Sequence, residues 1–302
     1  MKIFIRLGIM AMSVVMAASS FASLTVGGSS NSTTLANAGL GALPAGVTFT
    51  GSTYNGASLA SGTYSGLSFA PLTTIPSGLI MTTGDATVAV GSNNADSAGS
   101  SNGGPTASFT NYDGVNSISL FDVATLTINF NVKNATNLAF DFSYGSEEYY
   151  YYTNSPYNDS FFAFLDAGTK TLALDKNGKA ITINNQFLTI DNRPDTFSPS
   201  NGYGLPDKPG AGTAAGIAEL QYDGFTPVLR TSFDVTAGDH SLTFVIGDAG
   251  DTVLDSGVFI SNVFGPGSGK NDDTEPVPEP CTLIVLLGAS SFMAARGKRR
   301  AH

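Results

Sequence analysis

The sequence predicts an all-β fold, an antiparallel β-sandwich with a jelly-roll-like arrangement of strands. Short runs of β-branched and aromatic residues recur over residues 24–263, separated by Gly, Asn, Asp, Ser and Pro. In one run, Thr-Leu-Thr-Ile-Asn-Phe, polar and apolar residues alternate, which places Leu126, Ile128 and Phe130 on one buried face of a strand. The spacing of the runs lacks the helical crossovers of parallel sheets, and this favours two packed antiparallel sheets.

Twelve segments have the composition of strands, and helices are expected only at the two termini and in a turn near Thr34–Gly39. In chain order, the expected strands are Val47–Thr50, Gly78–Thr82, Ser117–Leu120, Thr125–Val132, Asn137–Ser143, Ser160–Asp166, Thr171–Leu174, Ala180–Asn184, Phe187–Ile190, Val228–Val235, Ser241–Ile246 and Gly257–Val263. The Asn177-Gly178 pair predicts a hairpin turn. Two loops, 84–114 and 191–216, are long for a compact domain, as functional or mobile loops are.

Charge and composition exclude several classes of function. The chain has 24 acidic and 14 basic residues, and a net charge of -10 lacks the basic footprint that nucleic-acid binding requires. We therefore expect no nucleic-acid partner. One Cys and two His leave too few ligands for a Cys/His zinc site. Of the two, His240 follows Gly238-Asp239 and is expected at a turn.

The first 22 residues predict a secretory signal peptide. Lys2 and Arg6 precede an apolar run at 7–18, and Ser20 and Ala22 are small residues at the positions that a signal peptidase reads. We therefore expect export through the Sec translocon and cleavage by signal peptidase after Ala22.

A second predicted targeting signal lies near the C-terminus, in residues 277–302. The sequence Val-Pro-Glu-Pro is followed by an apolar stretch at 281–295, which is short for a membrane span. A basic tail follows, which the positive-inside rule would keep in the cytoplasm; it consists of Arg296, Lys298, Arg299 and Arg300.

This three-part order resembles the PEP-CTERM sorting signal of Gram-negative bacteria. The resemblance implies transient tethering in the inner membrane by a short transmembrane helix, followed by cleavage by an exosortase near Pro278, Glu279 and Pro280. The expected end state is the cell envelope, the cell surface or the extracellular space. A linker rich in Pro and Gly, residues 265–276, joins the signal to the β domain, residues 23–264.

The exported body between the two signals is strongly acidic. Residues 23–280 keep 8 basic residues against all 24 acidic ones, a net charge of -16. Such a body suits divalent cations or a hydrated polysaccharide matrix, and solubility alone would also explain it. The single Cys, Cys281, lies beside the expected exosortase cut, so the body forms no disulfide.

Two acidic loops are the candidate metal site. Asp248, Asp251 and Asp255 lie in one loop between two strands, and Glu147, Glu148 and Asp159 flank another. Calcium takes six to eight oxygen ligands, commonly carboxylates and loop carbonyls. If the two loops meet at one end of the sandwich, they would bind Ca²⁺. The alternative is that these residues are solvated turn residues and strand caps.

The same carboxylates leave a glycan hydrolase open as an alternative. Glu147 and Glu148 are adjacent, so on a strand they point to opposite faces and do not easily flank one glycosidic bond. One of them could still pair with Asp159 or Asp251. Because any acidic exported protein contains such pairs, we expect no enzyme activity.

An unusual aromatic run, Tyr149, Tyr150, Tyr151 and Tyr152, is the candidate ligand-binding surface. Exposed on a loop, these rings would form a stacking platform for matrix polysaccharide or an envelope protein. The alternative is that alternate rings pack in the core.

Several segments together resemble the choice-of-anchor L domain. They include Ile75–Asp85, Phe140–Tyr149 with Asn158–Leu165, Tyr222–Thr226 and Gly247–Ile260, in this order along residues 35–262. The resemblance implies an exported domain found beside alternative surface anchors. It implies a location and no reaction.

The sequence therefore predicts an exported, non-enzymatic protein of the cell envelope or extracellular matrix, with a structural or adhesive role and with Ca²⁺ as its expected cofactor. The principal alternative is a carbohydrate-binding module for matrix polysaccharide, followed by a glycan hydrolase.

Overall fold

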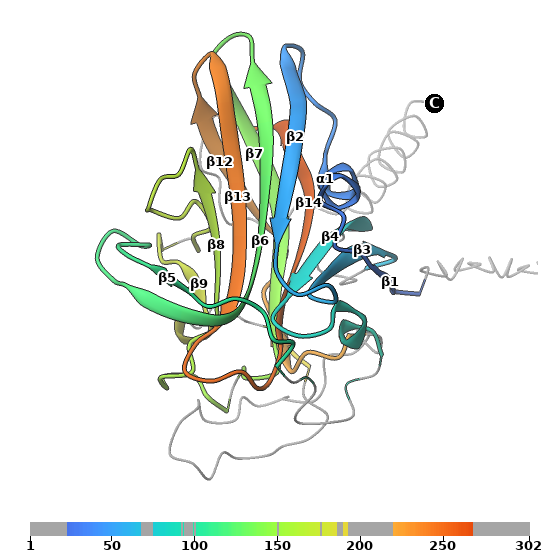
Figure 1. Ribbon diagram of the computed structural model, residues 1–302, viewed down its shortest axis with the longest axis vertical. Coiled ribbons are helices and arrows are strands. Elements are labelled where there is room, and N and C mark those ends of the chain that lie inside the picture. Colours follow the sequence, from blue (N-terminus) through green and yellow to red (C-terminus); the bar gives the residue numbers. More distant parts are fainter. Residues whose placement is uncertain are drawn as a thin grey trace, which may run out of the picture.

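Two antiparallel β-sheets pack face to face in the computed structural model, which confirms the predicted sandwich (Figure 1). The structure describes residues 23–67, 75–91, 93, 99, 101–149, 151–175, 177–185, 190–192 and 220–267. The predicted signal peptide, the sorting signal and most of the linker lie outside the described residues.

The larger sheet has eight strands in the order β1-β3-β4-β14-β7-β11-β10, and β12 also pairs with β7. Its strands are β1 (Thr25–Gly28), β3 (Ser61–Ser65), β4 (Ser77–Thr82), β7 (Thr136–Ser146), β10 (Ile190–Asp191), β11 (Gly224–Phe225), β12 (Leu229–Val235) and β14 (Ser256–Pro266).

The smaller sheet has the order β2-β6-β13-β8-β9, with β5 paired to one end of β6. Its strands are β2 (Val47–Asn55), β5 (Ala107–Phe109), β6 (Ile118–Val132), β8 (Ser160–Leu165), β9 (Ile181–Thr182) and β13 (Gly238–Asp248). The helical elements of the described chain are α1 (Ser32–Gly39), η1 (Ala86–Ala89) and η2 (Ile183–Asn185).

The alternation in β6 produces the buried face that it predicts. Leu126, Ile128 and Phe130 are all fully buried, and Leu126 and Ile128 pair in register with Phe244 and Leu242 of β13. Apolar side chains from the two sheets therefore meet between the layers. Burying each of them contributes roughly 1.5–3 kcal/mol to folding.

Aromatic rings join the two layers across this core. Phe140 of the larger sheet contacts Phe244 of the smaller sheet edge to face at 5.1 Å, and Phe142 contacts Phe161 at the same centroid distance. Aromatic pairs in this range add to the stabilisation from buried area.

The helical turn expected near Thr34–Gly39 is present as α1. Asn31 caps its N-terminus, accepting a hydrogen bond of 2.9 Å from the backbone N–H of Thr34, which an N-cap side chain typically does. Leu35 and Ala36 are buried in the main core. The helix therefore covers one open edge of the sandwich (Figure 1).

Two predicted strands are parts of one. Ser117–Leu120 and Thr125–Val132 both lie in β6, which runs on through Asp122 with a φ of 47°. The Asp122 carboxylate accepts a hydrogen bond of 2.9 Å from Gly104 N–H, which supports this irregular backbone. A polar residue such as Asp122 between two apolar runs suggests a loop in the sequence. In the structure its left-handed conformation is an irregularity within one continuous strand.

The predicted strand Thr171–Leu174 was wrong. This segment joins the next one only through a single bridge between Leu174 and Ala180. The intervening turn is confirmed, because Gly178 has a φ of 73° and the Asp175 carboxylate accepts the N–H groups of Asn177 and Lys179. The side-chain hydrogen bonds of Asp175 hold the turn without a longer ladder.

Other differences lie at polar strands and at boundaries. Four strands were not predicted: β1 and β3, whose sequences are rich in Gly, Ser and Thr, and β5 and β11, which have three and two residues and are too short to show an alternation. Strand β14 continues to Pro266, two residues past the predicted end of the domain. Within the described ranges, no helix is long and apolar enough to cross a membrane.

Candidate functional site

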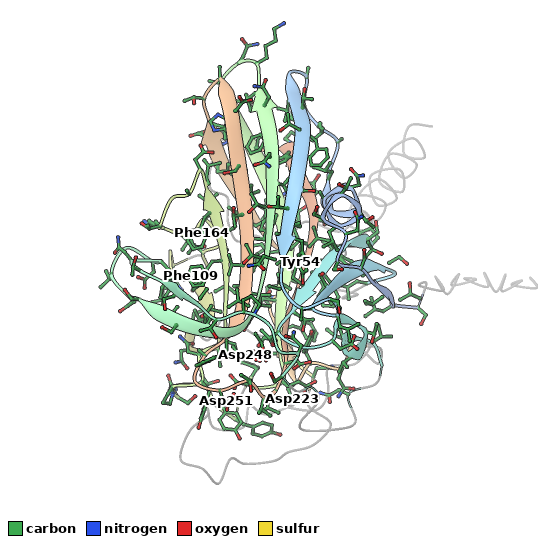
Figure 2. All side chains as sticks on the ribbon, in the orientation of Figure 1. Tyr54, Phe109, Phe164, Asp223, Asp248 and Asp251 are labelled. Atoms are coloured by element: carbon green, nitrogen blue, oxygen red, sulfur yellow. The ribbon has the colours of Figure 1, made fainter. Side chains whose placement is uncertain are left out.

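The candidate site lies at one end of the sandwich, where two connections pass from one sheet to the other. The chain leaves the larger sheet at the end of β7 and enters the smaller sheet at β8, and it returns from the end of β13 to the start of β14. Figure 2 shows Asp248 and Asp251 at this end. The two acidic loops predicted from the sequence are these two connections.

Hydrogen bonds fix the two connections against each other. The Asp159 carboxylate accepts one bond from Ala249 N–H at 2.9 Å and another from the Ser256 hydroxyl at 2.7 Å. The backbone N–H of Glu147 donates to the carbonyl of Asp255 at 3.1 Å. The two acidic loops therefore meet at one end of the sandwich, which the predicted calcium site requires.

Five of the six candidate ligands are buried. Glu147, Glu148, Asp159, Asp248 and Asp255 are each at most 2% exposed, and together they form what we call the carboxylate cluster. Asp251 is half-buried at its rim, where its carboxylate accepts the N–H of Val253 at 3.1 Å. Solvated turn residues would be exposed, so among these six only Asp251 fits that description; the role of a strand cap, the other part of the alternative, stays open for the buried five.

Burial and mutual repulsion control the protonation of the cluster. Burial raises the pKa of Glu148, and the neighbouring charges of Asp159 and Asp248 raise it further. The pKa of Asp248 is raised by the same two effects, burial first and then Asp159. Burial also raises the pKa of Asp159, while the bonds from Ala249 and Ser256 oppose the rise.

The carboxyl groups touch one another. The Asp159 side chain lies within hydrogen-bonding reach of both Glu148 and Asp248. Two carboxyl groups can share a hydrogen bond only when one of them carries a proton. Without a cation, the cluster must therefore hold protons at neutral pH.

Two oxygen atoms of the cluster are buried without a hydrogen-bond partner in the described part of the chain. They are Oε2 of Glu148 and Oδ1 of Asp248. Such atoms are rare in folded proteins and call for an explanation, for example an ion. In the present rotamers, no three His, Cys, Asp or Glu side chains of the described residues surround a common point as metal ligands do.

One tyrosine and two glycines that the sequence did not indicate also adjoin the carboxylate cluster. Tyr144 donates its hydroxyl hydrogen to Ser256 Oγ at 3.1 Å, and its pKa is raised well above the ordinary value by burial first and then by nearby carboxylates. Gly84 and Gly99 leave no room for a side chain, since a Cβ at either position would collide with the Asp255 carboxyl. The alternation of β7 places Tyr144 on the inner face, but nothing in the loop sequence identifies the two glycines.

The tyrosine run divides between interior and surface. Tyr149 and Tyr151 are buried, and the Tyr149 ring packs against Gly224. Tyr152 is half-buried and meets Tyr157 edge to face at 5.4 Å, while Tyr150 lies outside the described residues. The expected platform of four exposed rings is therefore corrected, because two of its members pack in the interior.

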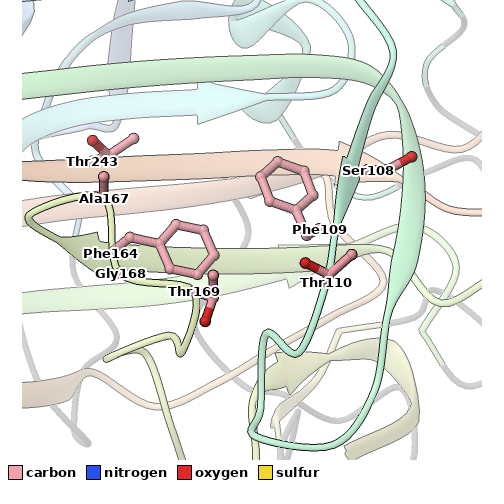
Figure 3. Close-up of a pocket in the computed structure, with 8 residues that line it drawn as sticks. All are labelled: Ser108, Phe109, Thr110, Phe164, Ala167, Gly168, Thr169 and Thr243. Atoms are coloured by element: carbon pink, nitrogen blue, oxygen red, sulfur yellow. The ribbon is translucent and has the colours of Figure 1, made fainter.

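A different aromatic surface lies on the smaller sheet. The rings of Phe109 and Phe164 stack with centroids 5.9 Å apart and planes 11° apart, and they line a groove of about 340 Å³ (Figure 3). Its remaining lining includes the hydroxyls of Ser108, Thr110, Thr169 and Thr243, and no charged side chain.

The single His of the described residues is part of a strand and not of a turn, which corrects the expectation for it. His240 lies in β13, with Nδ1 2.7 Å from the Asp166 carboxylate and Nε2 3.0 Å from the carbonyl of Thr236. Because both partners only accept hydrogen bonds, the ring can donate to both only when it is protonated on both nitrogens.

Residues 36–263 match the family of the choice-of-anchor L domain. No curated protein and no solved structure matches the chain.

Proposed function

The chain belongs to the choice-of-anchor L family, and on this premise we propose that this exported, surface-associated protein has a structural or adhesive role and catalyses no reaction. The proposal has three finer parts. They are sorting by an exosortase, residence in the envelope or matrix, and stabilisation of the domain by calcium.

The burial of the acidic residues carries this proposal. In a glycan hydrolase, two carboxyl groups must contact the scissile bond, one as acid and the other as base or nucleophile. Glu147, Glu148, Asp159 and Asp248 are each 1% exposed, and Asp159 lies within hydrogen-bonding reach of both Glu148 and Asp248. A polysaccharide cannot reach groups enclosed in this way, so they support a role in holding the domain together.

The sorting part of the proposal rests on the terminal sequence. The motif at 277–280, the apolar stretch and the basic tail stand in the order that an exosortase substrate requires. The last strand, β14, ends at Pro266, which leaves a short linker before the motif. Cleavage at Pro278-Glu279-Pro280 would release the folded domain from the inner membrane.

Fractionation of a Gram-negative host tests export and sorting. The full chain is produced in a strain that has an exosortase and in an isogenic strain that lacks it, beside the variant Glu279→Ala. We expect a shortened, surface-accessible protein in the first strain only, with the full-length variant and the protein of the second strain held at the inner membrane. Protein retained in the cytoplasm, or identical processing in both strains, would contradict the proposal.

The groove of Phe109 and Phe164 favours a second candidate function, binding of a neutral polysaccharide. Phe109 is half-buried, and the Phe164 ring stacked on it is 7% exposed, so Phe109 is the ring that a sugar would contact. An aromatic face with surrounding hydroxyl groups and no charge suits sugar rings, which offer C–H groups to the face and hydroxyls to the rim. The site differs from the tyrosine run considered in the sequence analysis.

Affinity electrophoresis with matrix polysaccharide tests this candidate. Phe109→Ala should weaken retention by roughly tenfold, while the control Phe121→Ala, an exposed Phe of β6 outside the groove, should leave it unchanged. Circular dichroism would verify that both variants fold. Equal retention of the two variants, or no retention of the unchanged protein, would remove this candidate.

A further inference from the structure

Three strand ends bring acidic side chains together from both layers of the sandwich. Asp248 is the last residue of β13, Asp159 directly precedes β8, and Glu148 follows the end of β7 by two residues. Asp159 is held from two sides, by Ala249 N–H and by the Ser256 hydroxyl. The position of at least one carboxylate is thus fixed by the fold itself.

No ion pair between described residues involves Glu148, Asp159 or Asp248. Glu148, Asp159 and Asp248 are each 1% exposed. The ion pairs of the described chain, Arg230 with Asp141 and His240 with Asp166, lie elsewhere. A buried charge usually has a paired cation or a bound metal, since its desolvation costs several kcal/mol.

The unpartnered oxygens are an independent indication of a ligand. Oε2 of Glu148 and Oδ1 of Asp248 are buried and accept no hydrogen bond from a described residue. A stable fold would ordinarily provide donors for such atoms or replace the residues by apolar ones. An ion that both oxygens coordinate would satisfy them.

We propose that Glu148, Asp159 and Asp248 are the core ligands of a divalent-cation site that ties the two sheets together, and that calcium is the cation. This inference deepens the calcium part of the proposed function, and it rests on export because calcium is abundant outside the cell. Three carboxylates supply a charge of -3 and up to six oxygens, which suits a hard divalent cation with oxygen ligands.

Calcium fits better than magnesium because of the geometry that the site offers. Magnesium requires a nearly ideal octahedron and keeps several water molecules, whereas calcium accepts six to eight oxygens in irregular arrangements. The ligands come from three different strand ends and have little exposure to water. Irregular, dry sites of this kind favour calcium.

Binding requires two side chains to turn. In the present rotamers the acidic groups do not surround a common point. Asp159 stays in place through its two hydrogen bonds, while Glu148 and Asp248 each have a free oxygen that can rotate toward the ion. Rotating side chains within a fixed backbone changes neither the sheets nor their connections.

Calorimetric titration of Ca²⁺ into the metal-free exported protein tests the proposal. We expect a dissociation constant of about 10⁻⁴–10⁻³ M, the range of extracellular modules. With about 10 mM Ca²⁺ the melting temperature should rise by roughly 3–10 °C. Terbium should also show tyrosine-sensitised emission, because Tyr144 adjoins the site through Ser256 and the chain has no Trp.

The variants Glu148→Gln and Asp248→Asn separate a metal site from a structural network. Each should weaken binding by roughly tenfold or more, while the metal-free variant melts at the same temperature as the metal-free parent or higher, since a neutral amide replaces a carboxyl group that must hold a proton when no cation is bound. The matched control is Asp239→Asn, which removes an exposed carboxylate from the opposite end of β13 and should leave binding unchanged.

Two results would overturn the proposal. The first is no heat and no melting shift with Ca²⁺, Mg²⁺ or Mn²⁺ in a protein that circular dichroism shows to be folded. The second is calcium binding that survives both variants. Either result would also remove the calcium part of the proposed function, but neither affects the export assay, so failure of the cation site is distinguishable from failure of export and sorting.

Discussion

Asp159 and Ser256 join the two sheets of the sandwich through one buried hydrogen bond of 2.7 Å. Asp159 precedes the first residue of β8 in the smaller sheet, and Ser256 is the first residue of β14 in the larger sheet. The Ser256 hydroxyl also accepts a hydrogen bond from Tyr144 of β7. One hydroxyl group therefore orients the best-fixed carboxylate of the proposed cation site.

Replacing Ser256 by Ala should destabilise the domain by about 1–3 kcal/mol, because a buried carboxylate oxygen and a buried phenol lose their partner. Urea denaturation of the two proteins measures this difference. The control Ser108→Ala removes an exposed hydroxyl that bonds only Ser119 and should change stability by less than about 0.5 kcal/mol. Equal effects of the two substitutions would contradict this role of Ser256.

Gly224→Ala should destabilise the fold by about 1–3 kcal/mol, since its methyl group would overlap the Tyr149 ring in the interior. Thermal or urea unfolding measures the loss. Gly28→Ala is the matched control, because this strand glycine is exposed and has open space around its Cα. If Gly224→Ala were as stable as the control, Tyr149 would not pack where the structure places it.

The pair of His240 and Asp166 should make stability depend on pH. The hydrogen bond to Asp166 raises the pKa of His240 from its ordinary value of 6.5, and Asp239 adds to this effect. A raised folded-state pKa means that the contribution is fully present below pH 6.5 and is lost as the pH rises through the folded value.

Asp166→Asn should therefore cost about 0.2–1 kcal/mol at pH 6 and progressively less toward pH 9, since the pair is partly exposed. Urea unfolding of both proteins across this range gives the difference, and NMR titration of the ring gives the pKa of His240 directly. A difference that grows with pH would contradict the assignment.

Side-chain alternation and loop placement account for what the sequence predicts correctly. Leu126, Ile128 and Phe130 have a strict period of two, so their strand and its buried face follow from local pattern alone. The two acidic loops could be placed because each is flanked by strong strand signals. In an antiparallel sandwich such loops gather at its ends.

The remaining features depend on contacts that are distant in the sequence. The tyrosine run has no alternation of its own, and the burial of Tyr149 depends on Gly224, a residue of another strand. His240 lies in a strand because the pairing of β13 with β6 begins at Gly238 and Val132, two residues before it. The Gly238-Asp239 dipeptide by itself suggests a turn. The groove of Phe109 and Phe164 forms where β5, a strand of three residues, lies beside β8. The sequence of either strand alone does not indicate a groove.

The central claim is that Glu148, Asp159 and Asp248 share a divalent cation, and a crystal structure of the exported protein grown with calcium tests it most directly. The account predicts one anomalous peak with carboxylate oxygens of these three residues at about 2.3–2.6 Å. Three carboxyl groups joined by short hydrogen bonds, with no peak between them or with calcium bound elsewhere, would contradict it.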